Sequence, residues 1–328
     1  MIESEQGILD AIGTTPIIRL KKLFPDTTGL RVFAKLEGLN PGGSIKDRPA
    51  VNMVQRAVDS GILVPGTSTL VESSSGNLGI GLAQVCAYLG IGFICIADTR
   101  TSPQNIKIMR ALGADVRIVD RPDPVTGELL TARKELVHRL VAAIPGAVSL
   151  DQYANPSNPQ AHHTTMHEIV AWLGEEIDFV VCATGTVGTL RGCADFIAAH
   201  GMRTKLVAVD AVGSVIFGQP SLPRLIPGHG ASERPAHFTE RLADHVVHVS
   251  DADCVEGCRR LAVTEAVLAG GSSGGITVAA QRFLSTLTAA ATCVLILPDR
   301  GERYLDTIYD DGWVGRNITA HQLAEHPN

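Results

Sequence analysis

Short apolar runs rich in β-branched residues alternate along the chain with segments whose apolar residues recur at helical spacing. Several of these runs are apolar on both faces, which is typical of strands in a parallel sheet covered by helices on either side. The runs that we interpret as strands are Arg31–Leu36, Thr69–Val71, Phe93–Ala97, Val116–Val119, Phe179–Cys182, Leu206–Val209, Val246–Val249 and Val294–Leu297. The pattern therefore predicts an α/β protein.

Polar and proline-containing signals mark helix starts and a boundary. Ser102-Pro103 and Ser250-Asp251 each place a polar cap ahead of a periodic segment, which predicts helices beginning there. A polar stretch rich in proline and asparagine, Asp151–Pro159, interrupts the alternation near the middle of the chain. We interpret it as a domain boundary, since 328 residues suffice for about two domains.

The stretch Leu78–Ala97 is apolar enough to be considered as a membrane span, because about 20 such residues cross a bilayer. Gly90 and Gly92 interrupt it. We therefore expect a buried helix over about 78–89, ending at a glycine C-cap, and a buried strand over about 92–97. No membrane association is expected.

Charge and cysteine usage narrow the class of protein further. The net charge is −6, without the basic stripe that nucleic-acid binding requires. The seven cysteines are scattered, odd in number and never spaced as CxxC, which indicates reduced thiols rather than disulfides or a zinc site. The acidic start lacks the features of a secretory signal, so we expect a cytoplasmic protein.

The first loop that could carry chemistry is Asn40–Pro49, which contains Lys46. Ser44 and Asp47 have the spacing of a capping box, which would place Lys46 at the start of a helix. A cation there opposes the helix dipole at a cost of about 0.3–1 kcal/mol, and the same field favours the neutral amine. A neutral lysine amine can form an imine with an aldehyde. The alternative is a solvated surface lysine.

The second loop, Glu72–Gly79, packs three serine hydroxyls, an amide and helix-opening N–H groups into a short span. Such a concentration of donors suits the α-carboxylate of an amino acid or another anion. The alternative interpretation is an ordinary serine-rich N-cap.

The third loop comprises Gly185, Thr186, Val187, Gly188 and Thr189, and its backbone N–H groups and hydroxyls could bind a phosphate. Asp210 ends the next predicted strand, so loop and acid together imitate a dinucleotide site. The G-x-G-x-x-G pattern is nevertheless broken at Val187. A nicotinamide-dependent oxidoreductase therefore stays as an alternative of a different class.

The fourth loop, Gly270–Gly275, contains Ser272 and precedes a predicted helix. Its glycines could equally mark a close crossing of two backbones. Taken together, the four loops offer a lysine for an aldehyde, a phosphate cradle, a carboxylate-binding loop and a hydroxyl for a ring nitrogen. This combination predicts a pyridoxal 5′-phosphate (PLP) site that acts on an amino acid.

Five motifs carry a family resemblance that covers nearly the whole chain. They are N-P-G-G-S-I-K-D-R (40–48), S-S-G-N (74–77), G-T-V-G-T (185–189), G-G-S-S-G (270–274) and L-P-D-R-G-E-R-Y-L (297–305). With them the sequence resembles the cysteine synthase family of fold-type II PLP enzymes. The resemblance implies a homodimer whose subunit has a tryptophan synthase β-like fold of two domains, each a mostly parallel twisted sheet flanked by helices. It further implies a larger cofactor-binding domain over 1–41 and 151–328 and a smaller, mobile substrate-binding domain over 42–150.

The same resemblance implies roles for the cofactor-binding residues. Lys46 would hold PLP covalently and act as the catalytic base, and Asn77 would hydrogen-bond the 3-oxygen of the ring. Residues 185–189 would bind the 5′-phosphate, and Ser272 would face the pyridine nitrogen. Val187 departs from the family, because a glycine is usual there, and we expect its side chain to point away from the phosphate.

For the substrate, the resemblance implies that Ser74, Ser75, Gly76 and Gln152 receive the α-carboxylate. An acidic substrate also needs a cation near its phosphate or side-chain carboxylate. The candidates are Arg234, Arg224, Arg48 and Arg303. We hypothesise that Arg234 supplies the cation, because this arginine follows a glycine-rich segment that is typical of an active-site loop.

A narrower resemblance lies in Lys35–Glu37, Asp151–Asn155, Val209–Gly218 and Pro227–Ser232. These segments are similar to a branch of the family that supplies 2,3-diaminopropionate for siderophores and some antibiotics. That branch implies β-replacement on O-phospho-L-serine with L-glutamate as the amine nucleophile and phosphate as the leaving group. The alternatives are a cysteine synthase using O-acetyl- or O-phospho-L-serine and sulfide, and a catalytically silent binding protein of the same fold.

Three histidines, His162, His163 and His167, are close enough in sequence to suggest a metal site. No carboxylate or thiolate completes a ligand set with them, so we expect a helix face and no metal.

Overall fold

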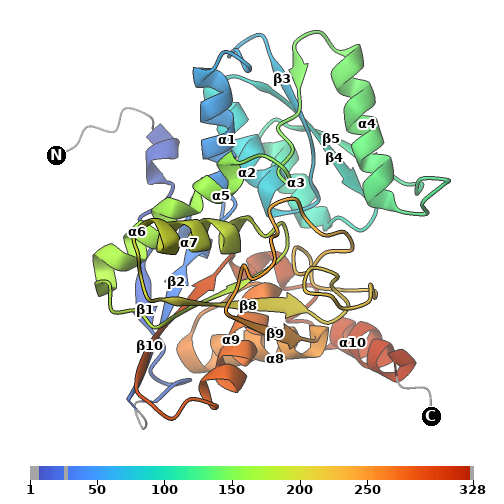
Figure 1. The fold of residues 1–328 in the computed structure, drawn as a ribbon. Coiled ribbons are helices and arrows are strands. Elements are labelled where there is room, and N and C mark those ends of the chain that lie inside the picture. Colours follow the sequence, from blue (N-terminus) through green and yellow to red (C-terminus); the bar gives the residue numbers. More distant parts are fainter. Residues whose placement is uncertain (1–6, 26–28, 326–328) are drawn as a thin grey trace. The chain divides into compact units, whose positions relative to one another are not determined.

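The computed structural model describes residues 7–25 and 29–325. It consists of two compact units (Figure 1). The first unit contains Asn40–Ala161 and the described residues up to Gly13, and the second contains Thr14–Leu39 and the described residues from His162 onward. Each unit is built on one sheet with helices packed against it, which confirms the predicted α/β class.

The units differ from the expected domains at three places. Residues 7–13, 40–41 and 151–161 belong to the first unit rather than to the second. Hydrogen bonds explain this assignment, because Gly13 N donates to Asn40 Oδ1 at 2.8 Å and Asn52 Nδ2 donates to the carbonyl oxygen of Ser157 at 2.6 Å. The polar stretch after residue 150 is therefore packed against α1 (Asp47–Asp59), and the boundary between the units falls just after it, between Ala161 and His162.

The first unit contains a parallel four-stranded sheet of order β5-β4-β3-β6. Its elements are η1 (Gly7–Ala11), α1 (Asp47–Asp59), β3 (Thr69–Ser73), α2 (Asn77–Leu89), β4 (Gly92–Asp98), α3 (Pro103–Ala111), β5 (Asp115–Val119), α4 (Leu129–Ala143), β6 (Ala147–Val148) and α5 (Ser157–Gln160).

Two cores cover the two faces of this sheet. On one face, Leu70 and Phe93 pack with residues of α1 and α2. On the other face, Val71 and Ile94 pack with Val137 of α4. Alternate side chains of a strand point to opposite faces, so the strands read as continuous apolar runs because both faces are buried.

The apolar stretch after residue 78 is a helix followed by a strand, as predicted. Helix α2 ends at Gly90, whose φ of 67° is the left-handed conformation that favours glycine at a C-cap. Strand β4 then lies in the middle of the sheet and is buried from Phe93 onward. Across the part of the chain that the structure describes, no helix combines the length and the apolarity needed to cross a membrane.

The second unit contains a six-stranded sheet of order β1-β2-β10-β7-β8-β9, in which only β1 is antiparallel. Its elements are β1 (Ile17–Arg19), β2 (Leu30–Leu36), η2 (Glu37–Leu39), α6 (His162–Leu173), β7 (Phe179–Ala183), α7 (Gly188–Ala199), β8 (Lys205–Ala211), β9 (His245–Val249), α8 (Asp251–Arg260), η3 (Leu261–Glu265), α9 (Gly271–Leu284), β10 (Ala291–Leu297), η4 (Gly301–Tyr304) and α10 (Asp311–Glu325). All eight predicted strands are present, whereas β1 and β6 were missed because three and two residues show no periodicity.

Local sequence signals agree with the observed helix starts. Ser102 is the N-cap of α3, and Pro103 is its first residue. Ser250 forms a complete capping box with Asp253: the Ser250 hydroxyl accepts from Asp253 N at 3.1 Å, and the Asp253 carboxylate accepts from Ser250 N at 2.8 Å. Both predictions are confirmed.

Two helices of the second unit cross at van der Waals distance. A Cβ placed on Gly274 of α9 would overlap the carbonyl oxygen of Cys254 on α8, and one placed on Gly257 would overlap the carbonyl oxygen of Gly274. Both glycines therefore allow the two backbones to touch. At least one glycine of the fourth loop, Gly274, is therefore required by this helix crossing.

All seven cysteines are free and buried, as the scattered spacing indicated. Burial raises the pKa of the Cys86 thiol to about 12, and burial likewise raises that of Cys95 to about 12. These thiols are neutral and behave as small apolar side chains.

Candidate active site

Lys46 lies immediately before α1, at the positive end of that helix, and its side chain is half-buried. The expected capping box between Ser44 and Asp47 is wrong in detail. The Ser44 hydroxyl accepts from Lys46 N at 3.1 Å, but the Asp47 carboxylate turns back to accept from Gly42 N at 2.5 Å. Asp47 is already the first helical residue, so its carboxylate orders the loop before Lys46 and leaves the lysine as N-cap.

The serine loop, residues 73–77, connects β3 to the N-terminus of α2. The Ser74 hydroxyl accepts from Gly79 N at 2.9 Å, so this serine caps an N–H group of the first turn of α2, although the N-cap residue itself is Gly76. Ser73 Oγ is buried and has no hydrogen-bond partner among the described residues, while Ser75, Gly76 and Asn77 are half-buried. Beside the capping serine the loop thus has polar groups able to bind a carboxylate.

Gln152 lies beside this loop, where the resemblance implied a shared subsite. Its Nε2 donates to the carbonyl oxygen of Ser73 at 3.3 Å, and its side chain is buried. The structure adds Glu72, which sequence reasoning included in the loop but gave no role. The Glu72 carboxylate accepts from the backbone N–H groups of Leu150 and Asp151 at 3.2 and 3.0 Å.

The phosphate loop, residues 185–189, follows β7 and leads into α7. Val187 is the N-cap of α7, with a φ of 66° and 2% of its surface exposed. A β-branched residue is strained in this left-handed conformation, which explains why a glycine is usual here. The Thr186 hydroxyl accepts from Gly188 N at 3.4 Å and so lies at the N-terminus of the 12-residue helix α7. A hydroxyl together with a helix N-terminus fits a phosphate.

Two neighbours restrict the phosphate loop. A Cβ on Gly185 would lie 2.6 Å from the carbonyl oxygen of Gly228, so the backbone of segment 227–232 packs closely against the loop. The Thr189 hydroxyl lies 3.3 Å from Nε2 of His162, which is fully buried at the start of α6.

The histidines do not form a metal site with other residues that the structure describes. His163 packs edge-on against the ring of Phe196. The described residues contain no group of three side chains suited to hold a metal ion.

Asp210 does not have the environment of a ribose-binding acid. It is completely buried, and its Oδ1 accepts from the Thr184 hydroxyl at 2.8 Å and from Ala211 N at 3.0 Å. A carboxylate that binds a nucleotide ribose must be accessible at the strand end. Because Asp210 is buried and hydrogen-bonded to Thr184, the oxidoreductase alternative loses its main support.

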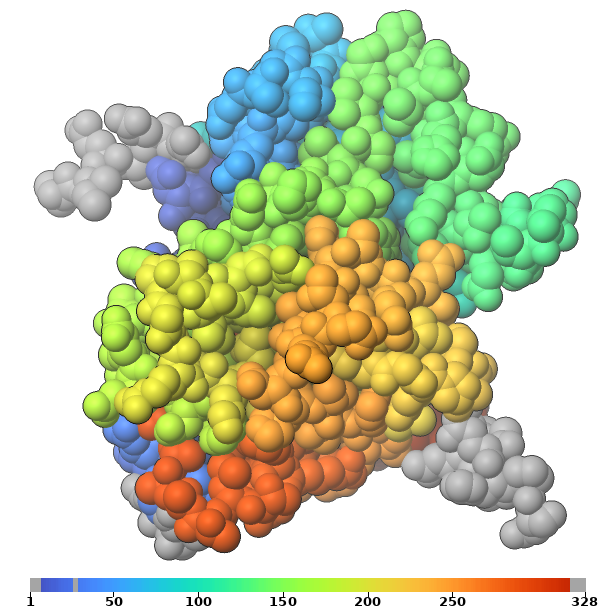
Figure 2. Space-filling model, in the orientation of Figure 1, coloured from blue at the N-terminus to red at the C-terminus, as the bar shows by residue number. Residues whose placement is uncertain are grey.

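Arg234 lies on the surface of the second unit, and Figure 2 shows the segment around residues 220–240 on the face turned to the viewer. Its guanidinium is 3.6 Å from the Glu240 carboxylate and 4.9 Å from the centre of the Phe238 ring. The preceding segment, 227–232, is tied to the phosphate loop because Gly230 N donates to the carbonyl oxygen of Thr184 at 2.8 Å. His229 of this segment is buried, and burial lowers its pKa.

Ser272 is the second residue of α9 and is half-buried. The turn before it is held by Gly270 N, which donates to the carbonyl oxygen of Asp299 at 3.2 Å. The loop therefore has a hydroxyl at a helix N-terminus, on the same unit as the phosphate loop.

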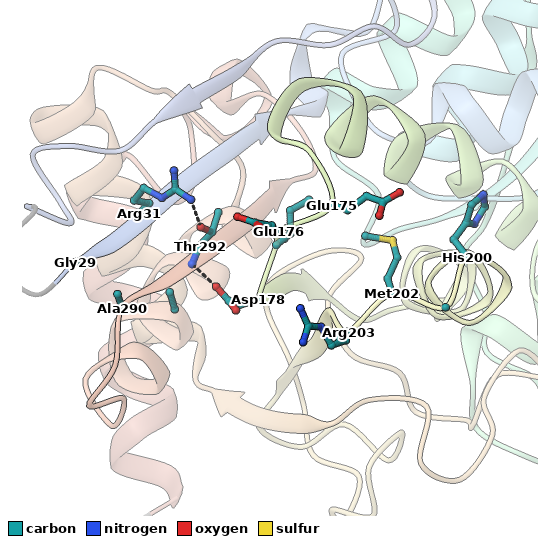
Figure 3. A pocket seen from close by; sticks show the side chains of 13 residues that line it. Gly29, Arg31, Glu175, Glu176, Asp178, His200, Met202, Arg203, Ala290 and Thr292 are labelled. Carbon is teal, nitrogen blue, oxygen red and sulfur yellow. Dashed lines mark hydrogen bonds between the residues drawn. The ribbon is translucent and has the colours of Figure 1, made fainter.

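A pocket of about 590 Å³ in the second unit is a separate feature (Figure 3). It lies where β2, β7, β8 and β10 begin, so it is at the opposite edge of the sheet from the phosphate loop, which follows the end of β7. Arg31 and Asp178 in its wall hydrogen-bond to Thr292. In α/β folds ligands bind at the carboxyl ends of the strands, so this pocket is not the candidate active site.

Comparison with known proteins identifies the class. Residues 8–299 match the model of the pyridoxal-phosphate dependent enzyme family, and the chain therefore belongs to this family. It is a fold-type II PLP enzyme that catalyses β-replacement, as the four loops and the resemblance predicted.

Individual relatives are similar to this chain over more than nine tenths of their lengths. The chain is 46% identical over 312 residues to N-(2-amino-2-carboxyethyl)-L-glutamate synthase of Ralstonia nicotianae, covering 95% of this chain and 91% of that protein. Among solved structures, an O-acetylserine dependent cystathionine β-synthase from Helicobacter pylori is similar with a TM-score of 0.86 and 32% identity, covering 94% of this chain and 100% of that one. O-ureido-L-serine synthase is similar with a TM-score of 0.83 and 32% identity, covering 94% and 98%.

Proposed function

We propose that the chain joins L-glutamate to the β-carbon of O-phospho-L-serine, giving N-(2-amino-2-carboxyethyl)-L-glutamate and phosphate. In this reaction the Cβ–O bond breaks, phosphate leaves with the electron pair, and the glutamate amine forms a Cβ–N bond and loses a proton. The observation that carries the proposal is the 46% identity to a synthase of this name over 95% of the chain. We further propose a homodimer that works in the cytoplasm.

The first unit would supply the lysine and the carboxylate subsite. PLP, when bound, withdraws electrons from Cα of an amino acid and so allows both the Cα proton and the β-substituent to leave. Lys46 Nζ would hold the cofactor, remove the Cα proton and return it. Ser74, Ser75, Gly76 and Gln152 would bind the substrate carboxylate. The buried Ser73 Oγ, which has no hydrogen-bond partner within the described part of the chain, adds another polar group to this loop.

We assign the remaining cofactor contacts to residues at the starts of three helices. Asn77, at the start of α2, would hydrogen-bond the 3-oxygen of the ring. Residues 185–189 would bind the 5′-phosphate through the N-terminus of α7, and Ser272 would meet the ring nitrogen. A hydroxyl at that nitrogen does not protonate the ring fully, as a carboxylate would, and this moderation favours elimination over transamination.

A cysteine synthase that uses sulfide is the second candidate. A hydrogen sulfide-producing enzyme from Fusobacterium nucleatum is similar in structure, with a TM-score of 0.84 and 32% identity, and uptake of sulfide at Cβ is the reverse of its release. Product analysis distinguishes the two candidates. Purified holoenzyme is mixed with O-phospho-L-serine and either L-glutamate or sulfide, and the products are identified by mass. We expect the glutamate adduct and phosphate in equal amounts. Cysteine formed from sulfide, with no glutamate adduct at any concentration, would select the second candidate.

Arg234 is proposed to bind the phosphate of the first substrate. Its ion pair with Glu240 is exposed, and such pairs stabilise a protein by about 1 kcal/mol or less. The substrate phosphate can therefore replace the Glu240 carboxylate as the partner of Arg234. We expect Arg234→Ala to raise the KM for O-phospho-L-serine by roughly 10- to 100-fold, because a hydrogen bond to a charged group contributes about 1.5–3 kcal/mol. Initial rates with O-phospho-L-serine and with O-acetyl-L-serine measure this effect.

Arg203 provides the matched control for Arg234, since it is an exposed arginine of the same unit that lines the separate pocket of Figure 3. Arg203→Ala should leave both KM values unchanged. If Arg234→Ala turned over O-phospho-L-serine like the wild type, another cation would bind the phosphate and this assignment would be wrong.

A further inference from the structure

We propose that Glu72 is a positioning residue for the substrate-carboxylate subsite, in which its carboxylate holds residues 149–151 against the end of β3 and so keeps Gln152 beside the serine loop. The proposal rests on the proposed function, because the role of Gln152 and the serine loop in substrate binding belongs to it. Every residue involved lies in the first unit.

Glu72 connects two segments that lie far apart in the sequence. It is the second-last residue of β3, and 4% of its surface is exposed. Its Oε1 accepts from Ser73 N at 3.2 Å. Its Oε2 accepts from Leu150 N at 3.2 Å and Asp151 N at 3.0 Å, with the Ser149 hydroxyl at 3.5 Å. Both carboxylate oxygens are therefore used as acceptors of backbone N–H groups.

The conformation of residues 151–152 depends on the hydrogen bonds that Glu72 accepts from Leu150 N and Asp151 N. Asp151 has a φ of 47°, a left-handed conformation that is uncommon for a non-glycine residue. The next residue, Gln152, is 6% exposed and donates to the Ser73 carbonyl oxygen. Asn158 Nδ2 donates to the Gln152 carbonyl oxygen at 2.7 Å. Glu72 and Gln152 thus contact the same serine-loop residue, Ser73, from two directions.

The charges around Glu72 make this arrangement sensitive to pH. Burial and, less strongly, the Asp151 carboxylate raise the pKa of Glu72, while the backbone N–H groups lower it, and the net pKa is about 7. On neighbouring β4, Cys95 is paired in register with Glu72 and is neutral, since burial raises its thiol pKa to about 12. Arg133 of α4 acts on Cys95 and lies 3.4 Å from the Asp98 carboxylate.

The sign of the pH effect follows from hydrogen-bond chemistry. The ionised carboxylate accepts all three N–H groups, whereas a protonated oxygen is a donor facing a donor. As the pH falls through about 7, Glu72 takes up a proton and its hold on residues 150 and 151 weakens. The KM for the first substrate should therefore rise with falling pH, beyond what the titration of the substrate itself causes.

The test compares Glu72→Gln with wild-type holoenzyme, using whichever first substrate gives product with the wild type. At pH 8 we expect the KM of that substrate to rise about tenfold, with kcat changed less than threefold and the cofactor absorbance retained. The ratio of the wild-type kcat/KM to that of Glu72→Gln should fall as the pH is lowered to 6, because wild-type Glu72 becomes neutral there. Backbone amide exchange at residues 149–152, followed by mass spectrometry, should be faster in the variant.

Asp123→Asn is the matched control, because Asp123 is a partly exposed residue of the same unit whose carboxylate also accepts backbone N–H groups, from Val125 at 3.1 Å and Thr126 at 2.7 Å. It should leave KM and its pH profile unchanged. Glu72→Asp keeps the charge but shortens the side chain by one methylene, which withdraws the carboxylate from Leu150 N and Asp151 N, so this variant decides the question if Glu72→Gln does not fold. A tenfold rise in KM for either Glu72 variant supports the proposal.

Two results would overturn the proposal. One is a foldable Glu72 variant whose KM and pH profile stay within twofold of the wild type. The other is an equal rise in KM for Asp123→Asn. Failure of the proposed function has a different signature, since the wild-type enzyme itself would then give no glutamate adduct.

Discussion

Replacing Lys46 by alanine is expected to reduce the rate of β-replacement about 1,000-fold or more, because the variant lacks both the covalent attachment of PLP and the base for the Cα proton. Proton transfer by a positioned side chain alone contributes about 10²- to 10⁴-fold. The measurement is the initial rate of product formation at saturating substrate, together with the absorbance of the bound cofactor. We expect the cofactor to remain bound through its phosphate but to lose the spectrum of the covalently attached form.

The control for Lys46 is Lys107→Ala, since Lys107 is an exposed lysine of α3 in the same unit. This variant should turn over at the wild-type rate. Turnover of Lys46→Ala within tenfold of the wild type, in protein that keeps its fold, contradicts the assignment of the catalytic base.

Gly274→Ala is expected to lower the free energy of unfolding by about 3 kcal/mol, near the upper end of the usual cost of overpacking. The added Cβ would overlap the Cys254 carbonyl oxygen and force α8 and α9 apart. Because Ser272 lies two residues earlier on α9, cofactor binding should weaken as well. Urea unfolding of the holoenzyme measures the change in stability.

Gly315→Ala makes the matched comparison for Gly274→Ala, because both glycines lie within helices of the second unit and a Cβ on Gly315 meets nothing within 4 Å. Its expected effect has the opposite sign, a gain of roughly 0.5–1 kcal/mol from the higher helix propensity of alanine. Equal stabilities of the two variants would show that the crossing of α8 and α9 tolerates a methyl group.

The strands and helix starts could be predicted from the sequence because local patterns determine them. The runs around Val71 and Ile94 are apolar on both faces since helices cover both sides of their sheet. The Ser250 capping box involves residues three positions apart and needs no tertiary contact. Strands of two or three residues, such as β1 and β6, carry too little pattern to be recognised.

The site could be predicted only in part, because its residue types are visible in the motifs and its contacts are not. The apparent capping box at Ser44 fails since Asp47 bonds instead to Gly42. The strain at Val187 is a backbone property that no side-chain pattern reveals. Glu72 reaches Asp151, 79 positions further along the chain, and such a contact follows from the fold alone.

Reduction of the holoenzyme with borohydride, followed by peptide mass mapping, tests the central assignment most directly. Borohydride converts the C=N bond between a lysine and PLP into a stable single bond, so the cofactor mass stays on the lysine that held it. The peptide containing Lys46 should carry this mass and lysines elsewhere should not. Label on a different lysine, or no label on protein that has bound PLP, would contradict the account.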